Sequence, residues 1–288
     1  MTDQPSPSPQ ERRLNLARRI GSGYAANRKT AVVMVSGSTG RGTADKYSDL
    51  ELDVYWREPP TADERRAAAL ACGAETVECF PYEAREWAEE ISVEGFTVGT
   101  STFLVSTMER YIAEVCVEAK PDPLAQMRLY AVQHAQVLFG DEALVNDWRE
   151  RIADYPPALA HAVLRQNLDF DGFGFAEDAL AARDDVVVLY ATLGKVARQV
   201  LGALLAVNGL YLPNPDFKRV DELIAEMQHK PPDLLARLKS AYRLPPVEGV
   251  AVMHGLATEV LELVDRQVAG FPTWRYKDRL KQRRAVWG

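Results

Sequence analysis

Residues 31–56 read AVVMVSGSTGRGTADKYSDLELDVYW, and this stretch decides the fold that we predict. Residues 31–36 form a short Val-rich apolar run, which is typical of a buried strand. The run ends at residues 37–42 (GSTGRG), a glycine-rich polar turn whose backbone amides can face a ligand. Residues 49–56 (DLELDVYW) predict a second strand. The stretch therefore predicts a strand, a turn that opens a short helix, and a strand.

The second predicted strand carries its charge on one face. Alternate side chains of a strand point to the same side, so the three acids are separated from the three aliphatic residues between them. The two sets are Asp49, Glu51 and Asp53, and Leu50, Leu52 and Val54. Three acids on one face repel each other unless a cation or solvent compensates for their charge. Mg²⁺ is a suitable cation because it accepts carboxylate and phosphate oxygens together.

The turn and the acidic strand together suit a nucleoside triphosphate bound with Mg²⁺. Backbone amides at the start of a short helix attract an anion. The turn is not a Walker A loop, because Thr43 stands where the lysine of that loop belongs. It is not a dinucleotide fingerprint either, because its glycines lack the G-x-G-x-x-G spacing.

Gly37-Ser38 followed by Asp49-Leu50-Glu51 on a strand resembles the signature of the DNA polymerase β-like nucleotidyltransferase superfamily. The segment GSTGRGTADKYSDLELDVYW resembles its small-molecule branch, the antibiotic nucleotidyltransferases, and within that branch the kanamycin nucleotidyltransferases. The resemblance implies an α+β fold in which an N-terminal nucleotidyltransferase-type mixed sheet with flanking helices is followed by a C-terminal helical bundle.

The resemblance also implies roles for residues of the turn and strand. Asp49 and Glu51 are expected to hold Mg²⁺. Gly37, Ser38 and Arg41 are expected to bind the nucleoside triphosphate. Asp53 lies further along the strand and is expected to matter less.

Residues 75–102 are rich in acids, and residues 91–93 and 96–102 predict a hairpin that turns at Glu94 and Gly95. In the superfamily a third carboxylate comes from a strand of this kind. Registered on the kanamycin enzymes, the segment places Gly99 at that position, which puts a second metal in doubt. The same register makes Glu90 a candidate contact for amino groups of the acceptor, with Glu94 as the alternative. A solvated acidic face is the other interpretation.

Helix signals delimit the rest of the chain. We expect residues 1–10 to be a disordered Pro/Ser-rich tail and residues 11–27 an amphipathic helix with a solvated arginine face. Residues 61–64 (TADE) and 106–109 (STME) match the capping-box pattern, and Arg65 and Arg66 are expected at the surface. A catalytic domain is expected over residues 11–120 and a helical substrate-binding domain over 121–288. The predicted helices are 106–118, 124–139, 142–154, 157–182, 185–208, 217–227, 233–242, 247–268 and 274–284.

Two places in the helical half carry candidate residues. Residues 167–174 (NLDFDGFG) are poor helix formers. By a loose register on the kanamycin enzymes, Asp171 falls near their general base, with Asp169 second; a kinked helix is the alternative. Lys195, on an otherwise apolar predicted helix, could neutralise charge on the leaving pyrophosphate. A solvated lysine is the alternative for that position.

Composition excludes several classes of protein. The 288 residues are 47% hydrophobic and carry a net charge of −7, which argues against binding to duplex nucleic acid. No apolar run approaches the length of a membrane span, and the N-terminus lacks the apolar region of a secretory signal. Three cysteines without C-x-x-C spacing fit reduced thiols in the cytoplasm. We expect a cytoplasmic monomer or homodimer.

These observations predict an enzyme that transfers a nucleoside monophosphate, with ATP the expected donor, to a hydroxyl of a small molecule. An aminoglycoside-like acceptor, and hence antibiotic resistance, would fit the acidic lining. One alternative is a nucleotidyltransferase acting on protein or RNA, as in toxin–antitoxin modules. Another is a non-catalytic nucleotide-binding regulator, which Gly99 makes worth retaining.

Overall fold

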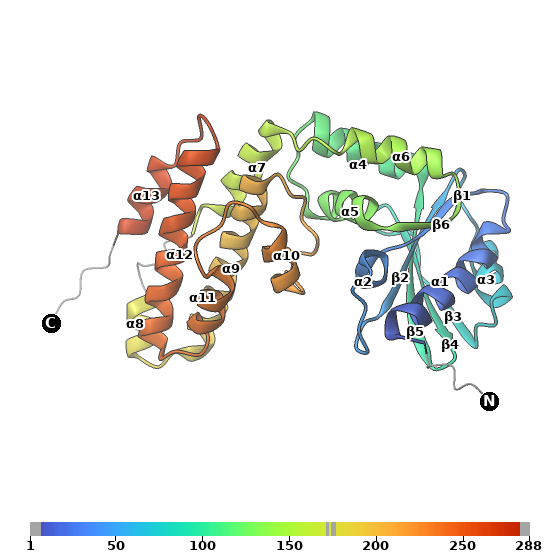
Figure 1. Cartoon of the computed structure of the whole chain (residues 1–288), viewed down its shortest axis with the longest axis horizontal. Helices are drawn as coiled ribbons and strands as arrows, with labels where there is room; N and C mark the ends of the chain where they lie inside the picture. Colours follow the sequence, from blue (N-terminus) through green and yellow to red (C-terminus); the bar gives the residue numbers. More distant parts are fainter. Residues whose placement is uncertain (1–6, 171–172, 174–176, 283–288) are drawn as a thin grey trace. The chain divides into compact units, whose positions relative to one another are not determined.

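The computed structural model describes residues 7–170, 173 and 177–282, apart from the side chain of Asp178. The chain forms two compact units. The first contains residues up to Glu114 together with Arg128–Ala153, and the second contains Val115–Met127 and the residues from Asp154 onward. The sequence prediction had placed a single boundary near residue 120. Figure 1 labels the elements of both units, which are described separately below.

The first unit is built on a six-stranded mixed sheet in the order β3-β4-β5-β2-β1-β6. Its strands are β1 (Thr30–Val35), β2 (Leu50–Trp56), β3 (Thr76–Cys79), β4 (Trp87–Val93), β5 (Phe96–Leu104) and β6 (Gln136–Gly140). Strands β2 and β5 are parallel, and the other neighbouring pairs are antiparallel. The predicted hairpin is confirmed: Val93 pairs with Phe96, and Glu94 and Gly95 both have positive φ, as in a type I′ turn.

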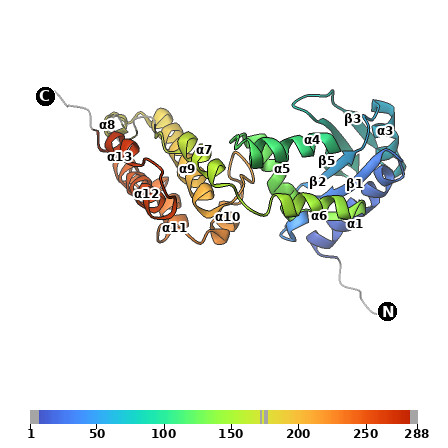
Figure 2. The same ribbon diagram turned by 90° about the horizontal axis from the view of Figure 1, so that it is seen from above.

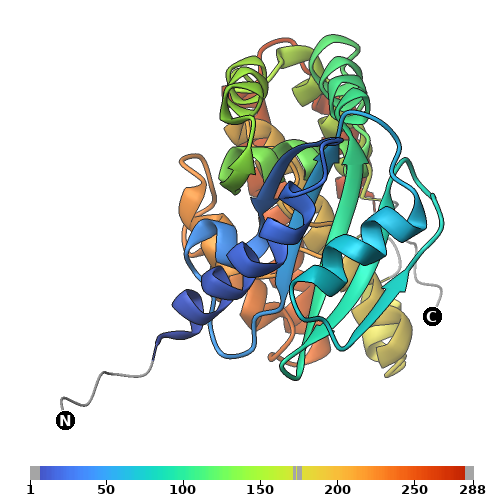
Figure 3. The same cartoon turned by 90° about the vertical axis from the view of Figure 1, so that its right-hand side faces the viewer.

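Two helices cover one face of the sheet: α1 (Pro9–Ala25) and α3 (Ala62–Ala71). Figure 3 shows both helices, dark blue and cyan, in front of the strands. The predicted aliphatic face of β2 lies here, since Leu50, Leu52 and Val54 are buried with Ile20 and Ala69 in one core cluster. Because burial of this face fixes the register of β2, the acids of the strand must point to the opposite face.

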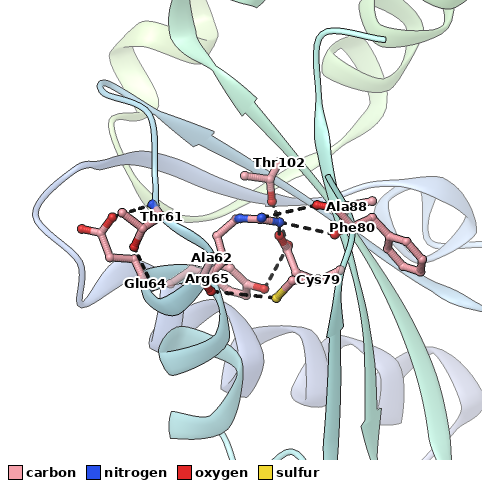
Figure 4. Close-up of polar contacts among 10 residues, drawn as sticks. Thr61, Ala62, Glu64, Arg65, Cys79, Phe80, Ala88 and Thr102 are labelled. Carbon is pink, nitrogen blue, oxygen red and sulfur yellow. Dashed lines mark hydrogen bonds and ion pairs between the residues drawn. The ribbon is translucent and has the colours of Figure 1, made fainter. Parts of the chain in front are cut away.

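Beneath α3 lies a buried ion pair. The Arg65 guanidinium is 2.5 Å from the Glu89 carboxylate of β4, and both side chains are almost fully buried. Arg65 also donates to the carbonyls of Ala88 and Phe80, as Figure 4 shows. The prediction that Arg65 lies at the surface is therefore wrong, whereas Arg66 is exposed. Since Glu89 points inward, its neighbour Glu90 points to the other face of the sheet.

On that second face, aromatic side chains fill one part of the sheet. Tyr55 of β2 stacks on Phe103 of β5, and their ring centroids are 5.2 Å apart. Trp148 of α6 (Glu142–Arg151) lies 5.0 Å from Tyr55, again between ring centroids. All three are buried. This part of the face is thus closed by packing, and the acids lie further along the same strands.

Residues 124–139 do not form the single predicted helix. Helix α5 (Pro123–His134) ends before β6, which pairs with β1. The apolar run of β6 joins the sheet because the β1 edge offers unpaired backbone groups, which local periodicity cannot reveal. The first unit consequently includes residues well beyond 120.

Helix ends agree with the sequence in one case and differ in two. Thr61 and Glu64 form the predicted capping box at α3. Helix α4 (Val105–Ile112) is preceded instead by Leu104 as its N-cap, and the side chain of Leu104 makes no capping hydrogen bond. The chain continues as a π-helix over Ala113–Val117. Glu109 of the second predicted box bonds Trp148 instead, at 2.6 Å. Helix α1 begins at Pro9, inside the expected tail, with Ser8 and Glu11 as a capping box.

The second unit is helical. Its described helices, besides the start of α5, are α7 (Pro157–Asn167), α8 (Glu177–Ala182), α9 (Val186–Asn208), α10 (Val220–Glu226), α11 (Leu234–Ala241), α12 (Pro246–Gln267) and α13 (Trp274–Lys281). Figure 2 shows α9 beside α7 and α12, against which it packs. The helix predicted over residues 157–182 is interrupted after Asn167, where buried Phe170 and Phe173 anchor the chain between α7 and α8.

Helix α9 is long and apolar enough to cross a membrane by length and composition. The sequence prediction did not identify it as such a span, because Lys195 and Arg198 interrupt the apolar run. The mostly buried core helix of a helical bundle passes the same test, but only 39% of the most apolar window of α9 is buried. Leu189, Leu193 and Val200 are among the buried residues of α9.

Candidate functional site

The turn after β1 is arranged around the carboxylate of Glu51. It forms the five-residue helix α2 (Gly37–Arg41), which Ser36 precedes in an extended conformation. The Ser36 amide donates to the Glu51 carbonyl at 3.1 Å. Gly37 has φ +58°, and a Cβ atom added there would overlap the Glu51 carboxylate. Only glycine therefore permits the carboxylate of β2 to lie against the start of α2.

Two glutamine side chains hold α2 in place. The Gln10 amide nitrogen donates to the Thr39 carbonyl at 2.8 Å, while its oxygen accepts from the Ala44 amide at 3.1 Å. The Gln136 amide nitrogen donates to the Gly40 carbonyl at 2.9 Å. Carbonyls at the end of a helix otherwise lack partners. The sequence prediction missed both residues, and Gln10 fell in the expected tail.

The loop between α2 and β2 is fastened to α1 by Arg13. This arginine is buried, and its Nε donates to the Ser48 carbonyl at 2.8 Å. Its terminal nitrogens also reach the carbonyls of Ser48 and Pro9. The prediction that the arginines of this helix form a solvated face is therefore wrong for Arg13. Arg13 is buried and fixes the position of Ser48, the residue before Asp49.

Glu51 and Asp53 lie on one face of β2, as predicted, and Asp49 directly precedes the strand, but the three acids do not share an environment. Asp49 and Glu51 are exposed, whereas Asp53 is buried. Burial raises the pKa of Asp53, against the charge of Arg128 and a contact with Ser36 that both lower it. Only the first two acids thus face solvent.

A half-buried arginine lies beside Asp53. Arg128 of α5 lies 4.0 Å from the Asp53 carboxylate and 2.5 Å from the Glu86 carboxylate, with its guanidinium 4.6 Å from the Phe103 ring centroid. Burial raises the pKa of Glu86, while Arg128 lowers it. The guanidinium of Arg128 thus lies between two carboxylates, and Asp53 has a charged partner within the protein.

An acidic row crosses the sheet beside Glu51. Gly99 of β5 pairs with Glu51 on one side and with Glu90 of β4 on the other. Paired residues of neighbouring strands point to the same face, so the two carboxylates flank Gly99. Both acids are exposed, and a Cβ atom added at Gly99 would meet no atom within 4 Å. A position without a side chain thus lies between two outward carboxylates.

Two further residues with predicted roles have charged or titratable neighbours: Glu94 lies beside Arg19, and Arg41 lies near His134. The Glu94 carboxylate lies 2.8 Å from Arg19 of α1, and this hydrogen bond lowers the pKa of Glu94. Glu94 is therefore neutralised by its own chain, unlike Glu90 in the described contacts. Arg41 is half-buried. Burial lowers the pKa of His134, and the charges of Arg41 and Arg149 lower it further.

The carboxylates of Asp49 and Glu51 suit a metal ion that the protein and a substrate bind together. Among the described residues, no three His, Cys, Asp or Glu side chains converge on one point. Mg²⁺ commonly takes one or two protein carboxylates, with water and substrate phosphates completing its coordination. Exposed Asp49 and Glu51 match that donor set, and a dedicated protein cage is absent from the described part of the chain.

The remaining predicted residues belong to the second unit. Asp171 lies outside the described residues. The Asp169 carboxylate accepts from Arg279 at 2.7 Å, and its carbonyl accepts from Gln199 at 2.7 Å. Lys195 is exposed on α9. The described contacts thus place Asp169 in an ion pair with the last helix.

Comparisons with known proteins give a distant structural likeness. No family model matches the sequence, and no curated protein matches it. Among solved structures, the fold is similar to a nucleotidyltransferase-like protein from Exiguobacterium sibiricum 255-15, with a TM-score of 0.42 and 12% identity. The match covers 88% of this chain and 77% of that one. At this level the likeness assigns no residue and no activity.

Proposed function

We propose that the protein transfers a nucleoside monophosphate, AMP from ATP, to a hydroxyl of a small molecule and releases pyrophosphate. The observation that supports this most directly is the contact between Glu51 and Gly37. It joins the two halves of the motif that resembles a nucleotidyltransferase: the glycine turn and the outward carboxylates. The reaction forms a bond from the acceptor oxygen to the α-phosphorus and breaks the bond from that phosphorus to the leaving pyrophosphate.

Each residue of the first unit has a defined part in this proposal. Backbone amides at Gly37 and Ser38 would face the phosphates, and Asp49 and Glu51 would hold Mg²⁺. The chemistry that Mg²⁺ supplies when bound is neutralisation of charge on the phosphates. Arg41 would bind the triphosphate from the end of α2. Asp53 has no direct part, because Arg128 holds it within the core.

Acceptor binding and proton removal are assigned to acids. Glu90 is exposed in the row with Glu51, and it would bind an amino group of a cationic acceptor such as an aminoglycoside. Asp171 remains the proposed base that takes the hydroxyl proton. Asp169 would have to leave its ion pair with Arg279 to act instead. Lys195 is proposed to neutralise the leaving pyrophosphate.

The experiment is incubation with each α-labelled nucleoside triphosphate, Mg²⁺ and a panel of hydroxylated small molecules, with and without amino groups. We expect labelled product and pyrophosphate in equal amounts, dependent on Mg²⁺. Asp49→Asn provides the matched inactive control. Binding without product would favour the second candidate, a nucleotide-binding regulator, which the vacant side-chain position at Gly99 supports. Labelling of a macromolecule in a lysate would indicate a protein or RNA acceptor.

A further inference from the structure

A pocket of about 360 Å³ lies in the first unit, apart from the acidic row. Helix α1 forms one wall through Arg12, Asn15 and Arg19, among others. The loop into β2 and the β4–β5 hairpin form the others, with Ser48, Leu50, Phe96 and Thr97 in the lining. The volume falls within the range of pockets that bind small molecules.

The walls of this pocket are fastened to one another. Arg13 bonds the Ser48 carbonyl, which ties the loop to α1. Arg19 and Glu94 form an ion pair that ties the hairpin to the same helix. The loop itself closes through a hydrogen bond from the Asp45 amide to the Ser48 hydroxyl. The cavity is consequently preformed, as binding pockets usually are.

The charge of the lining favours an anion. Three arginines (Arg12, Arg13 and Arg19) face two acids (Asp49 and Glu94). Arg12 and Arg19 are seven residues apart on α1, which places them on one face of the helix. Arg13 is used by backbone carbonyls and Arg19 by Glu94. In the described part of the chain, the Arg12 guanidinium has one partner, the Pro7 carbonyl, which its Nε reaches at 3.0 Å.

The rest of the lining is apolar. Leu16 and Leu50 form a buried floor, and Pro7 adds to the rim. Phe96 is 46% exposed although it is a large aromatic residue. A ring placed against Phe96 and Leu16 would remove that apolar surface from water. The pocket therefore offers one apolar side and one guanidinium with free donors.

We propose that this pocket is a binding site for a small aromatic anion, a ring system that carries a carboxylate, sulfonate or phosphate group. The ring lies against Phe96 and Leu16, and the anionic group accepts hydrogen bonds from Arg12. Asn15, one turn along the same face of α1, supplies a second donor. The pocket lining contains no residue of the turn over residues 37–42, and it shares only Asp49 with the proposed metal site. The test of this proposal does not depend on nucleotidyl transfer.

The probe is 8-anilinonaphthalene-1-sulfonate, whose fluorescence rises on binding, titrated well below the melting temperature. N-phenyl-1-naphthylamine has the same rings without the sulfonate. We expect one sulfonate probe per chain, bound at least fivefold more tightly than the neutral amine. Arg12→Ala should weaken the sulfonate about fivefold to tenfold and leave the amine unchanged, since an ionic hydrogen bond is lost. Phe96→Ala should weaken both probes.

Arg18→Ala is the matched control, because Arg18 is exposed on α1 outside the pocket lining, and it should change neither affinity. Arg12 and Phe96 are both exposed, and melting curves of the variants should confirm that they fold. Equal affinity of the sulfonate for the wild type, Arg12→Ala and Phe96→Ala would overturn the proposal. So would binding that does not saturate, or equal affinity of the two probes for the wild type.

Discussion

The carboxylate of Glu51 lies where a side chain at position 37 would begin, so Gly37 is required by its neighbour as well as by its own backbone. Position 37 has φ +58°, which favours glycine, and any Cβ atom would overlap the Glu51 carboxylate. The glycine of the turn and the acid of the strand therefore form one structural unit. A side chain at position 37 would displace the Glu51 carboxylate from its place against the turn.

Gly37→Ala should destabilise the protein and abolish Mg²⁺-dependent nucleotide binding. The positive φ alone costs about 1–2 kcal/mol for a residue with a side chain, and the overlap must also move Glu51. Gly42→Ala is the matched control, because Gly42 has φ +77° but no atom lies within 4 Å of its added Cβ. Thermal melting and nucleotide titration with Mg²⁺ measure both effects.

Gly42→Ala should therefore show only the loss of stability and retain nucleotide binding. Equal nucleotide affinity in the two alanine variants would show that the Glu51 contact has no part in the site.

The acids of β2 should separate into two classes. Asp49→Asn and Glu51→Gln should abolish transfer, because each removes a proposed metal ligand and lost charge neutralisation typically costs about 3 kcal/mol or more. Asp53→Asn should keep the Mg²⁺ dependence but lower the free energy of unfolding by about 1–3 kcal/mol, because it removes a buried partner of Arg128. Activity against Mg²⁺ concentration, with chemical denaturation, distinguishes them. Equal loss of transfer at all three positions would contradict the assignment.

The Arg65–Glu89 pair should be a major element of stability. Glu89→Gln should lower the free energy of unfolding by about 3–5 kcal/mol, since it leaves a buried guanidinium without its charged partner. Arg66→Ala, next to Arg65 but exposed, should change stability by less than about 0.5 kcal/mol. Urea denaturation of the three proteins tests this. A small effect of Glu89→Gln would mean that solvent reaches the pair.

Gly99→Asp should be accepted without a steric clash, because no atom lies within 4 Å of an added Cβ. The new carboxylate would stand between Glu51 and Glu90. Repulsion among three neighbouring carboxylates favours a bound cation, so Mg²⁺ affinity should rise. Isothermal titration with Mg²⁺ and nucleotide measures this. Gly99→Asn, of the same shape but neutral, is the control and should leave the affinity unchanged.

Glu64→Gln should change how the melting temperature depends on pH in the acidic range. Hydrogen bonds from Lys29 and from the Thr61 backbone lower the pKa of Glu64 to about 2. A lowered pKa contributes stability above the ordinary value near 4.5, and that contribution is lost as the pH falls toward 2. The variant should thus melt below the wild type at pH 7 and match it near pH 2. Asp63→Asn, in the same helical turn, controls for loss of a negative charge.

The sequence by itself determined the central motif and its strands. The Val-rich run, the glycine turn and the alternating acids predicted β1, α2 and β2 within one residue at each strand end, because period-two alternation is a local property. The hairpin at Glu94 and Gly95 followed from turn chemistry, and the Thr61 cap followed from a four-residue pattern. Each of these features depends on residues that are close along the chain.

Only the tertiary structure decided which charged residues are buried. Arg13 and Arg65 look like surface arginines in the sequence, yet both are buried and Arg128 is half-buried. Each is held by a partner at least 20 positions away, in Ser48, Glu89 and Asp53 respectively. The same holds for β6, whose apolar residues fit a helix until the β1 edge offers backbone partners. Local periodicity cannot encode such pairings, because they depend on where the sheet brings distant segments together.

The candidate site divides in the same way. Residue types and spacing identified Gly37, Asp49 and Glu51, but the register of β2, β5 and β4 was needed to place Gly99 between Glu51 and Glu90. The sequence alone predicted that Asp53 lies too far along the strand to act with Asp49 and Glu51, but it did not predict that Asp53 is buried. Arg128, which belongs to a helix 75 positions further on, lies beside the buried Asp53, whereas Asp49 and Glu51 are exposed. Desolvation depends on three-dimensional packing, so the environment of each acid is a property of the fold.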